Sequence, residues 1–197
     1  DDAIEINGLI LKHKSSIIIF LTVDVLFIGQ KLKDSVLENL REKKVLNKAF
    51  LDEDLIWMAS HNHHAPACDP NKPGLGRFNQ HFFDQLCNAA VQIISECLSS
   101  DFIEGYIEYG DAQAKGLIIN RRKRVWDGNP FKRGMRLYPN PGGPKDETVH
   151  MITCRAINGE VIALIWNFGC HTLTHYSRSR ISSDYPGVVR SRIRQEI

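Results

Sequence analysis

The sequence predicts an α/β protein with a mixed sheet that starts with parallel strands, flanking helices and a β-hairpin. An apolar, β-branched run at 17–28 is followed by a helical pattern at 32–46 and a second apolar run at 55–60. This strand–helix–strand order is typical of a right-handed parallel crossover. Further along, apolar segments at 149–156 and 161–168 flank an Asn-Gly pair, which is a strong hairpin signal. The 197 residues are enough to bury a hydrophobic core.

Each element of the first half has its own signal. The run 17–28 is apolar almost throughout, the pattern of a strand covered on both faces. Apolar residues recur at helical spacing over 32–46. A second buried strand is expected at 55–60, ending directly on His61. The segment 78–98 predicts a long amphipathic helix.

The second half predicts strands, one long loop and a final helix. Two shorter strands are expected at 103–109 and 114–120. The region 127–147 is dense in Pro and Gly and is expected to be a loop. The Asn158-Gly159 pair closes the hairpin, and Pro186 lies near the first turn of the last helix.

The composition excludes several classes of protein. Hydrophobic residues make up 43% and charged residues 24%, which excludes a disordered chain or a dense disulfide scaffold. With 25 Lys+Arg and 23 Asp+Glu the net charge is +2, so the overall electrostatic field of the protein does not favour binding of nucleic acid. The five cysteines are odd in number and form no CxxC pair, which favours buried free thiols.

A first cluster of chemically capable residues follows the strand at 55–60. His61 and His63 lie two residues apart, so in an extended chain both face the same side, while His64 faces away. They would then share a metal ion or divide between metal and substrate. The alternative interpretation is a solvent-exposed loop with incidental histidines.

A second cluster follows the strand at 161–168. That strand runs directly into Gly169, Cys170 and His171, and His175 follows four residues later. Because there is no glutamate between the histidines and Gly169 favours a turn, a metalloprotease-type helix is not indicated. We therefore expect His171 to be functional, His175 to lie on the surface and Cys170 to point into the core.

A third cluster is the basic run Arg121-Arg122-Lys123-Arg124, which follows a strand-like segment. One interpretation is a solvated face. The other is that one arginine is held at the site as a partner for a carboxylate or an oxyanion. No aromatic residues are interleaved with these cations, so a nucleic-acid patch is not indicated.

The sequence thus predicts that two neutral imidazoles from distant strand ends form half of a catalytic zinc site. Such a site has three or four N or O ligands and an open position for water. Bound zinc lowers the pKa of that water to about 7. The other ligands should be carboxylate or phenolate, and Asp184 and Tyr185 are the visible candidates.

Together the motifs resemble the neutral/alkaline, non-lysosomal ceramidases. The segment HNHHAPA (61–67) resembles the family's HTHSGPG motif, and INRR (119–122) resembles its NRS-type segment. NFGCHTLT (167–174) followed by ISSDYPG (181–187) resembles its second histidine segment and the turn and helix after it. TVDVLFI (22–28) is similar to its early strand that ends in an aspartate. The resemblance runs in order from about residue 16 to the end.

The resemblance implies a zinc-dependent amidase that cleaves the N-acyl bond of ceramide into a sphingoid base and a fatty acid. It implies that His61 and His171 are zinc ligands and that His63 faces the substrate and stabilises the tetrahedral intermediate. Arg121 would contact the polar group of the substrate, with Arg122 as the alternative. The family's glutamate and tyrosine ligands fall further along its chain. We therefore expect 1–197 to be a single α/β region, the N-terminal portion of a larger catalytic domain truncated at its C-terminal end.

Several positions depart from the family motifs. His64 replaces a serine, Ala65 and Ala67 replace glycines, and Arg122-Lys123 stand where Ser-Pro is common. These changes favour two alternatives to ceramide hydrolysis. One is a metallohydrolase acting on another acylated amine or ester, and the other is a non-catalytic lipid- or protein-binding relic of the fold.

The resemblance also carries expectations about partners and location. It implies an N-acyl sphingoid lipid as substrate and peripheral contact with a membrane surface, whereas nucleic acid is not expected. It suggests a secreted or membrane-surface protein, although no signal peptide is visible in the sequence.

Overall fold

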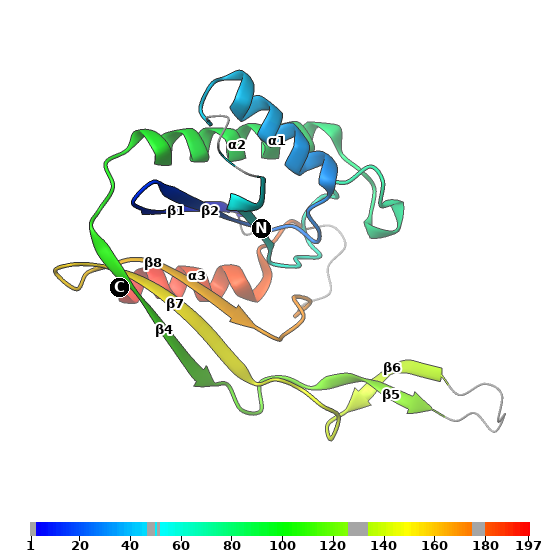
Figure 1. Cartoon of the computed structure of the whole chain (residues 1–197). Coiled ribbons are helices and arrows are strands. Elements are labelled where there is room, and N and C mark those ends of the chain that lie inside the picture. The colour runs from blue at the N-terminus through cyan, green and yellow to red at the C-terminus, as the bar shows by residue number, and fades with distance from the viewer. Residues whose placement is uncertain (1–2, 47–49, 51, 126–133, 175–179) are drawn as a thin grey trace. The chain divides into compact units, whose positions relative to one another are not determined.

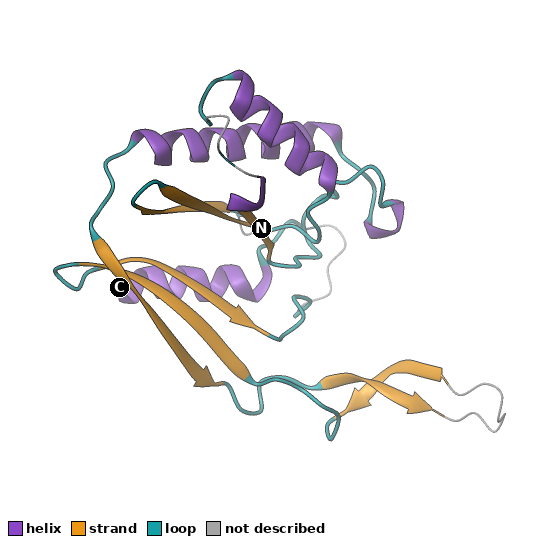
Figure 2. Cartoon of the chain, viewed as in Figure 1, coloured by secondary structure: helices purple, strands orange, loops and turns teal. Residues whose placement is uncertain are grey.

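The structure is a computed structural model that describes residues 3–46, 50, 52–125, 134–174 and 180–197. The chain divides into two compact units, Asp1–Phe102 with His171–Ile197 and Ile103–Cys170. Figures 1 and 2 show the helices and strands of both units, which form the mixed α/β architecture expected from the sequence. Each unit is described by itself below.

The first unit contains a three-stranded mixed sheet with the order β1-β2-β3. Strand β1 (Ile6–His13) pairs antiparallel with β2 (Ser16–Val23), and β2 pairs in parallel with β3 (Leu55–Ala59). The parallel pairing of β2 with β3 across a helix confirms the predicted crossover. Strand β1 was not predicted, because Gly8 interrupts its apolar pattern and the strand is only half-buried.

The predicted strand at 17–28 is shorter than expected, and its two faces are buried to different degrees. Strand β2 ends at Val23. Ile19 and Leu21 are fully buried, whereas Ile18 on the other face is 39% exposed. The chain leaves the sheet at Asp24, whose carboxylate accepts a hydrogen bond from the Glu5 backbone N–H at 2.9 Å. Tertiary contacts rather than apolar character thus end the strand.

Three helices complete the first unit, with α1 (Gln30–Glu42) and α2 (Gln80–Ser99) on one side of the sheet and α3 (Asp184–Glu196) on the other (Figure 2). Short 3₁₀ helices occupy Asp52–Asp54 and Pro73–Leu75. Asn79 caps α2 by accepting a hydrogen bond from the Phe82 N–H at 2.9 Å. Apolar side chains of α1, α2 and β2 form the core, among them Leu32, Val36, Leu40, Phe83, Ala90, Ile94, Ile19 and Leu21.

The second unit contains an antiparallel sheet with the order β4-β7-β8. Its strands are β4 (Gly105–Gln113), β7 (Thr148–Ala156) and β8 (Val161–Phe168). The predicted hairpin between β7 and β8 is confirmed. Gly159 has a φ of 89°, which glycine adopts readily, and the Asn158 side chain accepts a hydrogen bond from the Glu160 N–H.

The second unit also contains an antiparallel pair, β5 (Asn120–Val125) and β6 (Gly134–Asn140). The predicted strand at 114–120 is wrong, since Gly116 has a φ of 78° and turns the chain before β5 begins. Strand β6 lies inside the predicted loop 127–147. Backbone pairing with β5 stabilises it despite its Pro and Gly residues.

None of the helices within the described ranges combines the length and the apolar character needed to cross a membrane. The expectation of buried cysteines holds for three of the five. Cys68, Cys87 and Cys154 are buried, and the other two are half-buried.

Candidate functional site

Three histidine side chains gather in the first unit. One potential ligand atom from each of His61, His63 and His171 lies within 4.8 Å of the others. The Nε2 atoms of His63 and His171 are 3.1 Å apart, although the two residues are 108 positions apart in the chain. Ring centroids are 5.1 Å apart for His61–His63 and His61–His171, and 4.7 Å for His63–His171. Two segments distant in sequence thus meet at one point.

The first histidine segment is held alongside the end of β2. The Ser60 N–H donates to the Val23 carbonyl at 3.0 Å, and the Asn62 N–H donates to the Val25 carbonyl at 3.1 Å. His61 has a φ of 60°, a left-handed conformation that is uncommon for residues with a side chain. The extended conformation assumed from the sequence is therefore wrong at His61, although the structure does bring His61 and His63 together.

The second histidine segment is tied to the first by Thr172. This residue is 2% exposed, and its hydroxyl donates a hydrogen bond to the His61 carbonyl. The Leu173 N–H donates to the His171 carbonyl at 3.0 Å, which keeps the segment in a tight turn. No sequence pattern singles out Thr172, since its partner lies 111 residues away.

The cluster fits a zinc ion. Two nitrogen ligands of a tetrahedral zinc site lie about 3.4 Å apart, because each Zn–N bond is about 2.1 Å long. The Nε2 atoms of His63 and His171 have a similar separation, 3.1 Å, and a ligand atom of His61 lies within 4.8 Å of both residues' ligand atoms. Imidazole nitrogen is also a ligand type that zinc prefers. Geometry and donor chemistry therefore both permit a metal ion here.

Asp184, a candidate for a further ligand, has other partners and is not part of the histidine cluster. Its buried carboxylate accepts hydrogen bonds from the Thr174 N–H at 3.1 Å, the Thr174 hydroxyl at 2.9 Å and the Tyr185 N–H at 2.7 Å. One of its oxygens lies 3.6 Å from Nε2 of His64, which is also buried. Asp184 and His64 are thus buried residues that support the histidine segments and are not candidate ligands in this arrangement.

The remaining predictions concern residues other than the clustered histidines. Arg121 and Arg122 are exposed on β5 of the second unit, so a role beside the histidines stays a prediction. Cys170 is half-buried rather than a core residue. His175 lies outside the described residues.

The solved structures similar to this chain include two ceramidases. The neutral ceramidase from Pseudomonas aeruginosa shares 19% identity with a TM-score of 0.64, over 88% of this chain and 27% of that chain. A ceramidase complexed with C2 shares 18% identity with a TM-score of 0.65, over 90% of this chain and 27% of that one. The similarity shows the fold, and the chain spans about a quarter of the length of these proteins. The comparison with curated proteins gives no match.

The family comparison covers nearly the whole chain. Residues 8–197 match the family described as neutral/alkaline non-lysosomal ceramidase, N-terminal. The matched range contains both histidine segments and the elements that hold them. The chain therefore belongs to the neutral/alkaline non-lysosomal ceramidase family.

Proposed function

We propose that the chain is part of a zinc-dependent ceramidase that cleaves the N-acyl amide bond of ceramide or a ceramide-like lipid. The products would be a sphingoid base and a fatty acid. The observation that carries this proposal is the cluster of His61, His63 and His171 in a domain of the ceramidase family. A zinc ion bound by these histidines would supply an activated water, which is what hydrolysis of an amide requires.

In this proposal His61 and His171 would hold the zinc ion through their imidazole nitrogens. Bound zinc would supply a water of lowered pKa and would polarise the amide carbonyl. His63 lies next to His171 and donates a hydrogen bond to the oxygen on which negative charge develops. Arg121 binds the polar group of the substrate. The water oxygen joins the acyl carbon, the C–N bond breaks, and a proton passes to the departing amine.

The departure from the family motif at position 64 does not favour a different substrate. His64 is 7% exposed and faces the buried Asp184. A residue in this position affects packing behind the histidines rather than contacts with a lipid. The alternative of a substrate other than ceramide, such as another acyl amine or an ester, therefore depends on the changes at Ala65 and Ala67 and at Arg122-Lys123.

The test uses the full-length protein and the variants His61→Ala and His171→Ala. Both variants should lose bound zinc, measured by elemental mass spectrometry, together with hydrolysis of a fluorescent N-acyl sphingosine. His81→Ala is the matched control, since His81 is exposed on α2. Stoichiometric zinc in both site variants would overturn the ligand assignment. A wild-type protein without zinc or activity would instead favour a non-catalytic relic.

His63→Ala separates two roles for that residue. If His63 faces the substrate, the variant keeps its zinc and loses hydrolysis. If His63 is a third ligand, zinc is lost as well. A panel of N-acyl amines and acyl esters, assayed with the wild-type protein, then identifies the class of bond that is cleaved.

A further inference from the structure

Asn62, between His61 and His63, is the most deeply buried polar residue of the first histidine segment. Its exposure is 0%. A buried amide costs free energy unless its polar atoms are hydrogen-bonded. The side-chain nitrogen donates to the Ser182 carbonyl at 2.7 Å and to the Asp24 carbonyl at 3.4 Å, and the side-chain oxygen accepts from the His64 N–H at 2.9 Å. Each polar atom of the amide therefore has a partner.

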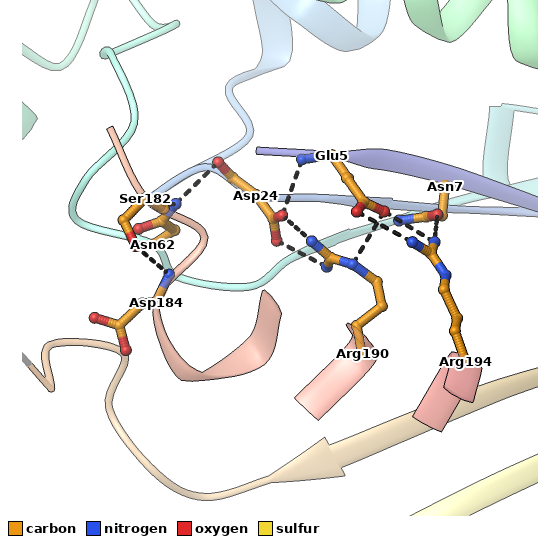
Figure 3. Close-up of polar contacts among 8 residues, drawn as sticks. All are labelled: Glu5, Asn7, Asp24, Asn62, Ser182, Asp184, Arg190 and Arg194. Carbon is orange, nitrogen blue, oxygen red and sulfur yellow. Dashed lines mark hydrogen bonds and ion pairs between the residues drawn. The ribbon is translucent and has the colours of Figure 1, made fainter. Parts of the chain in front are cut away.

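These partners come from separate parts of the chain. Asp24 follows β2 and lies 38 residues from Asn62, whereas Ser182 precedes α3 and lies 120 residues away. Figure 3 shows the Asn62 side chain between these two residues. One side chain thus joins the end of the central strand, the histidine loop and the segment that leads into α3.

The same Ser182–Asp184 turn also holds the second histidine segment. The Ser182 hydroxyl accepts a hydrogen bond from the Asp184 N–H at 3.0 Å, and the Asp184 carboxylate binds Thr174, three residues after His171. Thr172 in turn donates to the His61 carbonyl. Buried hydrogen bonds therefore link both histidine segments to one turn.

We propose that Asn62 is a positioning residue that holds His61, the proposed zinc ligand, and the neighbouring His63 in place before the metal arrives. This inference rests on the proposed function. Ligands that are already held lose less conformational freedom on binding, so a metal ion binds them more tightly. The left-handed backbone at His61 needs such support, because surrounding contacts must stabilise a sparsely populated conformation.

The chemistry of the contacts explains why asparagine suits this position. The partners of the Asn62 side chain are two carbonyl oxygens, which accept, and one backbone N–H, which donates. A side-chain amide matches them because its nitrogen carries two donor hydrogens and its oxygen accepts. Aspartate has nearly the same shape but would place a carboxylate against two carbonyl oxygens. Asn62→Asp therefore changes the hydrogen bonds and leaves the volume almost constant.

The experiment measures zinc affinity of the full-length wild-type protein, Asn62→Asp and Asn62→Ala by competition with a chromophoric chelator. We expect zinc affinity to fall by about 10- to 100-fold in both variants, the range seen when outer hydrogen bonds of metal ligands are removed. The visible absorption spectrum of the cobalt(II)-loaded protein should change as well, because ligand geometry determines it. Thr172→Val removes the hydrogen bond from the Thr172 hydroxyl to the His61 carbonyl with little change in volume. This variant should also bind zinc more weakly than the wild-type protein.

Leu40→Ala is the matched control for stability. Leu40 is fully buried on α1 and makes none of these hydrogen bonds. It should lower the melting temperature but leave zinc affinity and the cobalt spectrum unchanged. Wild-type zinc affinity in the Asn62 variants, or an equal loss in Leu40→Ala, would overturn the positioning role. A wild-type protein that binds neither zinc nor cobalt would overturn the proposed function, and the metal-positioning role with it.

Discussion

Arg190 of α3 and Asp24 at the end of β2 form a two-point ion pair across 166 residues of sequence (Figure 3). The Nη2–Oδ2 distance is 2.7 Å and the Nη1–Oδ1 distance is 3.4 Å. The Asp24 side chain is 3% exposed and that of Arg190 is 19% exposed. Since the Asp24 carbonyl also accepts from Asn62, the residue that ends β2 contacts both α3 and the histidine loop.

Removing the carboxylate of this pair should destabilise the fold strongly. Asp24→Ala leaves the mostly buried Arg190 guanidinium without one partner, and we expect the free energy of unfolding to fall by about 3 kcal/mol. Guanidinium chloride titrations followed by circular dichroism measure this change. Arg194→Ala removes an exposed ion pair with Glu5 and should cost less than about 1 kcal/mol. If both variants lost the same free energy of unfolding, burial of the Asp24–Arg190 pair would not explain its contribution to stability.

Glu5 should make stability depend on pH under acidic conditions. Burial raises the pKa of its carboxyl, but the Arg194 hydrogen bond and the charges of Arg190 and Arg194 outweigh this and hold the pKa below 4.5. A carboxyl with a lowered pKa stabilises the folded state above its unfolded pKa, and this contribution is lost as the pH falls through the folded pKa.

The free energy of unfolding should therefore fall as the pH drops below 4.5, the ordinary pKa of the group. In Glu5→Gln this fall should be smaller, because the side chain no longer takes up a proton. Denaturant midpoints measured between about pH 6 and pH 3 test the difference. Identical pH profiles for wild type and Glu5→Gln would show that another carboxyl is responsible.

Cys68 should be unreactive in the folded protein. Burial and the neighbouring Asp69 charge raise the pKa of its thiol from 9.0 to about 11. At pH 8 about one such thiol in a thousand is ionised, and the thiolate is the reactive form. Its sulfur also donates to the Phe27 carbonyl at 3.3 Å.

We expect iodoacetamide to label Cys68 in urea but scarcely without it, as peptide mass spectrometry would show. Cys97 is half-buried and serves as the internal comparison. Labelling of Cys68 as fast as that of Cys97 in the folded protein would contradict its burial.

Gly159 should be required for the β7–β8 hairpin. With a φ of 89° it adopts a conformation that is strained for alanine, so Gly159→Ala should lower the free energy of unfolding by about 1 kcal/mol. Gly110 on β4 has open space around its missing side chain, and Gly110→Ala should be neutral or stabilising. Thermal unfolding of the two variants measures the contrast, and a similar loss in both would rule out backbone strain as the cause.

Much of the fold could be predicted because local patterns determine it. The helical spacing at 32–46 and 78–98 anticipated α1 and α2, and the order of apolar segments anticipated the parallel pairing of β2 with β3. The Asn158-Gly159 pair anticipated the β7–β8 turn. These features depend on residues close together in sequence, whose propensities and periodicity act over a few turns or strand lengths.

The residue types of the candidate site were also visible in the sequence. His61, His63 and His171 each follow an apolar strand. Functional sites in α/β proteins gather at the carboxyl ends of strands, so this position marked them as candidates. Their approach to within 4.8 Å could not be derived from spacing, because the backbone turns at His61. The contacts of Asn62 and Thr172 had no sequence signal at all.

The sequence by itself thus predicted helices α1, α2 and α3, the parallel pair β2–β3 and the candidate metal-binding histidines. Tertiary structure alone decided that β2 ends at Val23, that β6 pairs with β5 and that Asn62 reaches Ser182. The physical reason is that a hydrogen bond or ion pair between residues 120 or 166 positions apart depends on the whole chain path. Local propensity, which acts within a few residues, carries no information about that path.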